Sequence, residues 1–397
     1  MKPVEIKKDI WWVGAVDWDL RDFHGYETEK GSTYNAYLVK GTNKTVLFDT
    51  VKVEFAGQLI SNIKEIIEPE KIDYIVSNHA EMDHTGALPE IIELVKPEKL
   101  ICSKKGRDTL RAHFHRDDWP FEIADPNTAL DLGGRTVQFI GSPMLHWPES
   151  MTSYIPEEGM LISNDIFGQH YASSKRFADE VEQGELFWQA SKYYANIFLP
   201  LSPGMRKFLD KLEKQCPKLD ILAVDHGLIW RNDVSAIVEK YRFWSNQETT
   251  NKAVVVYDTM WGSTAKMARA IADGLMSDDI SVRLFDLHHN HRSDIMTEAL
   301  EARAILLGSP VLNGNILPKM AALVTYMKGL SPANKIGAAF ASYGWNDVAT
   351  KQLNAAMEEM KFEIVDPGVG VQYVPTDEDL KKCFDLGVKV REAILRQ

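Results

Sequence analysis

The last part of the chain constrains the fold most, because short apolar runs alternate there with helix-like stretches. Strands are predicted at residues 253–257, 281–286, 304–308, 335–340 and 368–374. Helices are predicted between them, at about residues 264–276, 295–302, 318–327 and 347–360, with a last one at 377–396. Strands interleaved with helices indicate a doubly wound parallel sheet, whose ligand lies at the carboxyl ends of the strands.

The first part of the chain alternates less regularly. Short β-like runs at residues 10–13, 34–39 and 45–50 come before a helix-like segment that ends near residue 67. Further strands are predicted at residues 72–76, 99–102, 136–140, 160–162 and 221–224, with a helix at 86–95. This pattern favours an α/β fold in which two layered sheets are covered by helices, an αββα sandwich.

A polar stretch at residues 246–252 (Asn-Gln-Glu-Thr-Thr-Asn-Lys) separates the two patterns. A chain of 397 residues is too long for one ordinary hydrophobic core, so two domains are expected. We therefore predict domains at residues 1–249 and 250–397.

Composition and charge exclude several classes of partner. The formal charge is −12, from 45 basic and 57 acidic side chains, which disfavours nucleic acid and anionic membrane surfaces. The N-terminus has no apolar core of a signal peptide, and no run reaches the roughly 18 apolar residues that span a bilayer. A cytoplasmic protein with no membrane segment is expected.

The three cysteines, Cys102, Cys216 and Cys383, are far apart in the sequence. There is no Cys-x-x-Cys pair, which excludes a built-in rubredoxin-type or cysteine-bound iron–sulfur centre. A sparse, odd number of cysteines also fits a reducing compartment.

A cluster of metal-ligand residue types follows the predicted strand at residues 72–76. His79, Glu81, Asp83 and His84 fall within six positions. Two imidazoles and two carboxylates without a thiolate suit iron or manganese at least as well as zinc. The alternative interpretation is a polar, well-capped start of a helix.

Three further candidate ligands each follow a predicted strand: His146 after residues 136–140, Asp165 after residues 160–162, and His226 after residues 221–224. Taken singly, such a His is more often an ordinary hydrogen-bonded residue, and such an Asp is more often a helix cap. Because all of them come just past the carboxyl ends of strands, they are expected to converge at one edge of the sheets.

The second part of the chain carries a candidate phosphate-binding turn between its first strand and first helix. The turn consists of Thr259, Met260, Trp261, Gly262, Ser263 and Thr264. Small hydroxyl residues and a glycine at the N-terminus of a helix cradle a phosphate through backbone N–H groups and hydroxyls. The alternative is an ordinary connection between a strand and a helix.

Two more loops at the same sheet edge are candidate parts of this site. One contains Pro310, Val311, Leu312, Asn313 and Gly314 after the third strand, and the other contains Ser342, Tyr343, Gly344 and Trp345 after the fourth. Each loop alone is compatible with an ordinary connection, whereas three in the right order favour a cofactor site.

The cluster at residues 79–84 resembles the His-x-His-x-Asp-His motif of the metallo-β-lactamase fold, with Glu81 in place of the second histidine. That carboxylate favours iron over two zinc ions, and it is typical of the flavodiiron proteins, which the chain resembles along essentially its whole length. The matching stretches are residues 13–18 (Val-Gly-Ala-Val-Asp-Trp), 33–38 (Thr-Tyr-Asn-Ala-Tyr-Leu), 145–148 (Leu-His-Trp-Pro) and 225–227 (Asp-His-Gly).

The resemblance implies a division of the ligands between two non-haem irons. His79, Glu81 and His146 would bind one iron, and Asp83, His84 and His226 the other, with Asp165 bridging them. In relatives the position of His84 need not bind iron in every state. His24 is a candidate catalytic residue near the substrate pocket, or else a hydrogen-bonded loop histidine.

The resemblance also implies an activity and partners. The expected reactions are reduction of O2 to water and of NO to N2O, with electrons passed through FMN from rubredoxin or a similar donor. Two Fe²⁺ and reduced FMN together hold the four electrons that O2 requires. A head-to-tail homodimer or a tetramer is expected, because each cofactor lies at the edge of its own domain.

Two other functions remain open on the sequence. One is a zinc-dependent hydrolase of the metallo-β-lactamase type with a flavodoxin-like appendage, against which Glu81 argues. The other is an electron carrier that has kept an inactive first domain, against which the intact set of candidate ligands argues. The sequence does not indicate whether O2 or NO is preferred.

Overall fold

The computed structural model describes residues 2–396, which form two compact units. The first unit contains the residues up to 193 and residues 203–242, and the second contains residues 194–202 and those from 243 onward. Each unit has its own hydrophobic core.

The first unit is built on two facing sheets. The first sheet has the strand order β1-β2-β7-β8-β9-β10-β11. Its strands are β1 (Val4–Lys7), β2 (Ile10–Trp12), β7 (Tyr37–Lys40), β8 (Thr45–Phe48), β9 (Tyr74–Ser77), β10 (Lys99–Cys102) and β11 (Phe121–Ile123). The second has the order β12-β13-β14-β15-β16-β17. Its strands are β12 (Leu130–Asp131), β13 (Thr136–Gly141), β14 (Met151–Ile155), β15 (Met160–Asn164), β16 (Ile221–Val224) and β17 (Trp230–Arg231).

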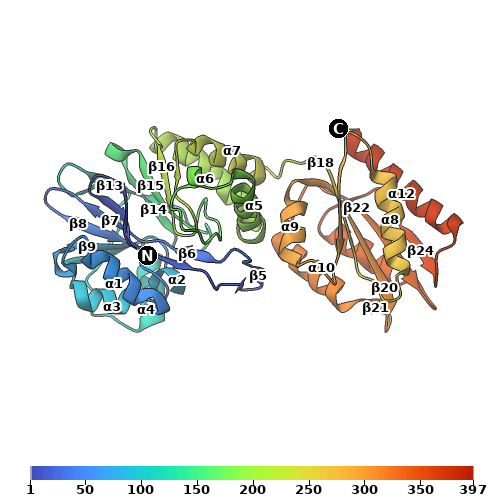
Figure 1. The fold of residues 1–397 in the computed structure, drawn as a ribbon, viewed down its shortest axis with the longest axis horizontal. Coiled ribbons are helices and arrows are strands. Elements are labelled where there is room, and N and C mark those ends of the chain that lie inside the picture. Colours follow the sequence, from blue (N-terminus) through green and yellow to red (C-terminus); the bar gives the residue numbers. More distant parts are fainter. Residues whose placement is uncertain (1, 397) are drawn as a thin grey trace. The chain divides into compact units, whose positions relative to one another are not determined.

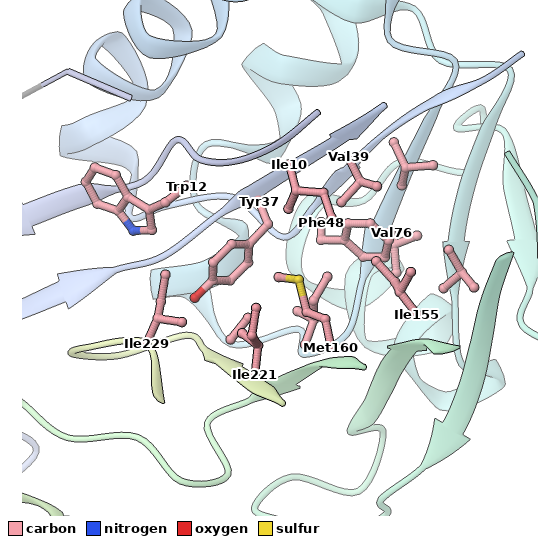
Figure 2. Packing of buried hydrophobic residues seen from close by; sticks show 14 of the residues in the cluster. Ile10, Trp12, Tyr37, Val39, Phe48, Val76, Ile155, Met160, Ile221 and Ile229 are labelled. Carbon is pink, nitrogen blue, oxygen red and sulfur yellow. The ribbon is translucent and has the colours of Figure 1, made fainter. Parts of the chain in front are cut away.

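The core of this unit lies between the two sheets. Figure 2 shows Tyr37 and Phe48 of the first sheet facing Met160 and Ile221 of the second. Successive side chains of a strand point to opposite faces, so each sheet keeps a second apolar set for the helices outside it. Burial of such apolar surface provides roughly 25 cal/mol per Å².

Helices cover the outer faces of both sheets (Figure 1). Beside the first sheet lie α1 (Ala56–Lys64), α3 (Leu88–Val95) and α4 (Lys104–Phe114), and beside the second lie α5 (Gln183–Tyr193), α6 (Ser202–Gln215) and α7 (Val234–Ser245). Smaller elements are β3 (Ala15–Asp17) paired with β6 (Ser32–Tyr34), and the hairpin of β4 (Asp22–Phe23) and β5 (Tyr26–Glu27). Single helical turns of this unit are η1 (Val53–Phe55), η2 (Pro69–Lys71), η3 (Pro156–Glu158) and η4 (Ala178–Glu180), whereas η6 (Leu199–Leu201) belongs to the second unit. The predicted αββα sandwich is confirmed.

The second unit is a parallel sheet with the order β19-β18-β20-β22-β23, and β24 also pairs with β22. Its strands are β18 (Thr250–Tyr257), β19 (Ser281–Asp286), β20 (Ala302–Leu312), β21 (Asn315–Ile316), β22 (Ile336–Tyr343), β23 (Glu363–Ile364) and β24 (Val369–Gln372). Its helices are α8 (Ser263–Leu275), α9 (Arg292–Glu301), α10 (Pro318–Leu330), α11 (Ala349–Glu359) and α12 (Asp377–Leu395). The order confirms the predicted doubly wound sheet and is that of a flavodoxin-like fold.

Helices α8 and α12 lie side by side on one face of this sheet, and α9 and α10 lie on the other (Figure 1). Glycines permit the close contact of α8 with α12. A Cβ on Gly274 would lie 2.1 Å from the Phe384 carbonyl oxygen, and one on Gly387 would lie 2.2 Å from that of Ile271. Any larger side chain would push the two helices apart.

The structure differs from the sequence-based prediction at several strands. The short strands β1, β11, β12 and β17 were not predicted, and three larger differences concern longer segments. The single strand predicted at residues 34–39 is split, because Asn35 turns its side chain inward to accept a hydrogen bond from Trp12 Nε1 and donate one to the Val224 carbonyl. Strand β14 (Met151–Ile155) was not predicted, although it is buried throughout. Strand β20 (Ala302–Leu312) continues past the predicted end at residue 308 and forms a hairpin with β21.

In the part of the chain that the structure describes, no helix combines the length and the apolar character that crossing a membrane requires.

Candidate functional site

Loops at the ends of four strands bring the predicted metal ligands together. His79 follows β9, Asp165 directly follows β15, and His226 follows β16. His146 comes from the loop that joins β13 to β14. The seven predicted side chains fall into two groups, each close enough to hold an ion: His79, Glu81, His146 and Asp165 in one, and Asp83, His84 and His226 in the other. His84 and Asp165 also form a third such group with Asp225, which was not predicted.

Asp165 lies between the two groups, and each of its oxygens faces a different pair of imidazoles. Its Oδ2 is 2.8 Å from His146 Nε2 and 3.6 Å from His79 Nε2. Its Oδ1 is 3.2 Å from His84 Nε2 and 3.6 Å from His226 Nε2. One carboxylate can therefore serve two ions at once.

Each group also has a carboxylate of its own. In the first, Glu81 Oε2 lies 3.2 Å from both His79 Nε2 and His146 Nε2. Donor atoms bound at about 2.1 Å to a common metal are roughly 3 Å apart, so these separations fit a shared ion.

The second group depends on a short helix, α2 (Met82–Thr85). Asp83 and His84 are adjacent on it, and both side chains are buried. Asp83 Oδ2 lies 3.2 Å from His226 Nε2, and its Oδ1 lies 3.5 Å from His84 Nε2. The helical turn thus allows two neighbouring residues to face the same point.

Several buried polar atoms of the site lack a hydrogen-bond partner among the described residues. They are both carboxylate oxygens of Asp83, both ring nitrogens of His84 and Oδ1 of Asp165. Buried polar atoms are nearly always hydrogen-bonded, because leaving them unpaired costs about 1–3 kcal/mol each. These atoms fit the role of metal ligands, and the oxygen and nitrogen donor set fits iron.

The site attracts positive charge. Burial alone would raise the pKa of Glu81, but hydrogen bonds from His146 and His79 lower that pKa to about 2. Burial would likewise raise the pKa of Asp165, but the charge of His84 keeps that pKa well below its usual range. Burial alone would lower the pKa of His79, whereas hydrogen bonds to neighbouring carboxylates raise that pKa to about 10. Ionised carboxylates inside the protein thus draw cationic charge to the cluster.

The imidazoles are oriented by bonds on their far side. Nδ1 of His79 lies 2.8 Å from Glu149 Oε1, and Nδ1 of His226 lies 2.7 Å from the Thr33 carbonyl oxygen. An Nδ1–H donated to either acceptor leaves the Nε2 lone pair free for a metal. Sequence reasoning missed Glu149. Its position three residues after His146, in a loop already assigned to the site, is the signal that would have found it.

A cavity of about 620 Å³ opens beside the cluster. Its lining includes Glu81, Asp83, Phe23, His24 and Trp147. The His24 ring lies at the mouth, with a side chain 77% exposed and Nε2 3.7 Å from Glu81 Oε1. The structure therefore brings His24 close to the cluster.

Another histidine near the cluster was not predicted. His170 is fully buried, its ring centre lies 4.8 Å from that of His226, and its Nδ1 lies 2.7 Å from Ser32 Oγ. It lies five residues after the candidate ligand Asp165, in the same segment that follows β15, and this nearness in sequence is the signal that would have found it.

The predicted phosphate turn connects β18 to α8. Gly262 has φ +87°, a conformation that suits glycine, and its N–H donates to Thr259 Oγ1 at 3.1 Å. The hydroxyls of Thr264 and Ser342 lie 2.9 Å apart, which joins this turn to the loop after β22. The start of α8 (Ser263–Leu275) offers free backbone N–H groups to an anion.

A cavity of about 370 Å³ lies beside this turn, within the size range of small-molecule sites. Its lining combines the three predicted loops with one residue after β24: Met260, Trp261, Ser263, Pro310, Val311, Ser342, Tyr343, Gly344, Trp345 and Tyr373. The other predicted residues lie in the same loops outside that lining: Thr259, Gly262, Thr264, Leu312, Asn313 and Gly314. Trp261 and Trp345 are 95% and 89% exposed, so flat aromatic surfaces stand at the mouth.

Comparison with known proteins agrees with this two-part construction. A family model described as "ODP family beta lactamase" matches residues 33–227, and a flavodoxin model matches residues 255–387. The chain is 46% identical over 396 residues to a nitric oxide reductase of Moorella thermoacetica, and the alignment covers 99% of both.

Solved structures resemble the whole chain. The rubredoxin oxygen:oxidoreductase of Desulfovibrio gigas has a TM-score of 0.96 at 42% identity, with 99% of this chain and 98% of that chain covered. A flavodiiron protein of Giardia intestinalis also has a TM-score of 0.96, at 32% identity, with 100% and 97% covered.

Proposed function

Because the chain belongs to the flavodiiron protein family, we propose that it reduces O2 to water, NO to N2O, or both, at a pair of iron ions. Electrons would arrive through FMN from rubredoxin or a similar donor. The observation that carries this proposal is the position of Asp165, whose two oxygens face separate groups of histidines.

The proposed ligands of each iron are the side chains that contact one another in the structure. His79, Glu81 and His146 would hold one iron, and Asp83, His84 and His226 the other, with Asp165 shared between them. Supporting observations are the separations of roughly 3 Å, the burial of these side chains and the unpaired atoms of Asp83, His84 and Asp165. Three carboxylates against two Fe²⁺ leave one positive charge, which a hydroxide would balance.

When bound, the iron pair supplies two electrons and open coordination positions for a diatomic gas, and reduced flavin supplies two more electrons. The residues around the cavity would exclude water and supply a proton. Phe23 and Trp147 form part of its wall, which favours a small apolar gas over water. His24 lies close enough to Glu81 to hold or donate a proton at the mouth through Nε2.

The second domain is proposed to bind FMN. Thr259, Ser263 and Thr264 would bond the phosphate together with the backbone N–H groups at the start of α8. The loops at residues 310–314 and 342–345 would flank the flavin ring. Trp261 and Trp345 offer aromatic surface there.

Apolar side chains at both cavities support the proposal of a head-to-tail homodimer, or a tetramer built from such dimers. Val53 and Met82 are 58% and 47% exposed beside the metal cavity, and Trp261 and Trp345 are exposed beside the flavin cavity. Surfaces of this kind commonly mark contacts between proteins. We also propose domain limits at residues 1–249 and 250–397, and a cytoplasmic location, where free cysteines persist.

The proposal is tested by anaerobic turnover. Protein loaded with Fe²⁺ and FMN is supplied with reduced rubredoxin and then with O2 or NO, and consumption of each gas is measured. Consumption of at least one gas is expected, and failure with both would contradict the proposal. Glu81→His restores the histidine of the zinc hydrolases, so this variant should lose activity and bind zinc in preference to iron.

A further inference from the structure

Glu149 is a buried carboxylate with a specific partner. Its side chain is 2% exposed, and Oε1 lies 2.8 Å from His79 Nδ1. The same oxygen accepts a hydrogen bond from the Ala80 N–H at 3.1 Å. Burying a carboxylate costs several kcal/mol unless such partners offset it, so its place behind His79 calls for a function.

The loop that carries Glu149 also carries His146. Within it, the Met144 N–H donates to the Trp147 carbonyl at 2.8 Å, and the Ser142 N–H donates to the Ser150 carbonyl at 3.0 Å. These bonds hold His146 and Glu149 in one compact turn. The Glu149 side chain therefore links this turn to the segment after β9 that carries His79.

The histidines of the other group lack an equally close carboxylate. His226 Nδ1 meets a neutral acceptor, the Thr33 carbonyl oxygen. His84 Nδ1 is 3.7 Å from Asp225 Oδ2, and it has no hydrogen-bond partner among the described residues. A carboxylate behind a ligand histidine makes the imidazole a better donor, and loss of such a partner typically costs 10–100-fold in metal affinity.

We propose that Glu149 is a positioning residue that holds His79 and His146 as a pair, and that it makes the metal position they share the more tightly bound of the two. This inference rests on the proposed iron centre. It does not depend on which gas is reduced, because Glu149 acts through His79 rather than on the substrate.

The experiment measures iron release from the FMN-loaded protein to a chelator under anaerobic conditions. Glu149→Ala should release about one iron per chain 10–100-fold faster than the unmodified protein, while the other iron leaves at its usual rate. Glu149→Gln keeps the size and one acceptor oxygen but loses the charge, so its release should be intermediate.

A spectroscopic comparison identifies the position that is lost. Asp83→Asn removes a proposed ligand of the other iron, so the Mössbauer spectrum of the iron that it retains should differ from that of Glu149→Ala after partial release. Identical spectra in the two variants would overturn the assignment of Glu149 to the His79 position.

Ser103→Ala is the matched control. Ser103 Oγ donates to the Glu149 backbone carbonyl at 2.7 Å and so holds the same loop without touching the carboxylate. Its iron release should stay near that of the unmodified protein. The inference fails if Ser103→Ala releases iron as fast as Glu149→Ala, or if both Glu149 variants release both irons at the usual rates.

Two further measurements distinguish failure of this inference from misfolding of a variant and from failure of the proposed function. Equal unfolding temperatures of the metal-free variants would show that Glu149→Ala still folds, and if it does not, the Glu149→Gln variant carries the test. Failure of the unmodified protein to bind iron at all would contradict the proposed function itself rather than the position of Glu149.

Discussion

At the scale of single residues, Asp165 connects the two halves of the candidate metal site. Both of its oxygens are needed to contact the two groups of histidines. Oδ2 faces His79 and His146. Oδ1 faces His84 and His226. Asp83 differs, since its contacts lie within one group. Changes at these two carboxylates should therefore have different consequences.

We expect Asp165→Asn to lower bound iron from about two ions per chain to fewer than one, because an amide nitrogen cannot act as a ligand and bridging is lost. Asp83→Asn should leave about one. Iron per chain, measured by atomic emission after gel filtration, distinguishes the two. Equal iron contents in the two variants would contradict the bridging role of Asp165.

The three cysteines should be unreactive in the folded protein. Burial raises the pKa of Cys102, Cys216 and Cys383 to about 12 in each case. At pH 8 almost no thiolate is present, and the thiolate is the reactive form. A disulfide reagent such as DTNB should detect less than about one thiol per chain in minutes, and about three after denaturation in guanidinium. A fast-reacting thiol in the native protein would contradict this.

Part of the site is visible in the sequence, because candidate ligands follow strands and several of them cluster. His79, Glu81, Asp83 and His84 fall within six positions. The structure places them in the candidate metal cluster, and Glu81 and Asp83 also line the cavity. Their role as ligands remains a prediction. Glu149 was missed although it follows His146 by three residues, because its role depends on a contact with His79, which lies in a loop distant in the sequence.

At the scale of elements, the second domain was predicted well because its central strands β20 and β22 are mostly apolar and helices lie between the strands. Strand β19 (Ser281–Asp286) begins and ends at the predicted residues. Strand β14 (Met151–Ile155) was missed because Thr152 and Ser153 make it look polar. Both are fully buried, and their hydroxyls bond the Ile140 carbonyl and the Asn78 side chain. Such compensation cannot be recognised before the partners are known.

The turn before α8 should depend on the conformation of Gly262. A Cβ there would meet nothing within 4 Å, so Gly262→Ala acts only through its φ of +87°, at a cost of about 1 kcal/mol. We expect FMN affinity to fall about fivefold, measured by quenching of flavin fluorescence.

Gly134→Ala is the matched control for this prediction. Gly134 has φ +76° and equally open surroundings, but it belongs to the turn between β12 and β13 in the first unit. Its substitution should carry a similar strain without changing FMN affinity. If both variants bind FMN equally well, the conformation of Gly262 does not matter for the cofactor.

At the scale of the whole molecule, one segment packs with the unit that follows it in sequence. Residues 194–202 interrupt the first unit and belong to the second. Within the second unit, the Asn196 side chain donates to the Ser293 carbonyl at 3.2 Å and accepts from the Tyr326 hydroxyl at 2.8 Å. The stability of the second unit therefore depends on residues outside its main stretch of chain.

We expect Asn196→Ala to destabilise the second unit by roughly 1–3 kcal/mol, because two partners lose a buried hydrogen bond. Release of flavin on heating should then occur at a lower temperature. Asn62→Ala is the control in the first unit, where Asn62 donates to the Val13 and Gly14 carbonyls. That variant should lower the stability of the first unit and leave flavin release unchanged; the opposite pattern would refute the assignment of residues 194–202.

The divided second unit also limits how such genes can be recombined. A foreign flavin-binding module joined at residue 243 would meet a host chain that still supplies residues 194–202 but no longer offers Ser293 and Tyr326 to receive them. Exchange of modules by simple end-to-end fusion would deprive Asn196 of its hydrogen bonds with Ser293 and Tyr326. A working chimaera must carry both stretches from the same parent.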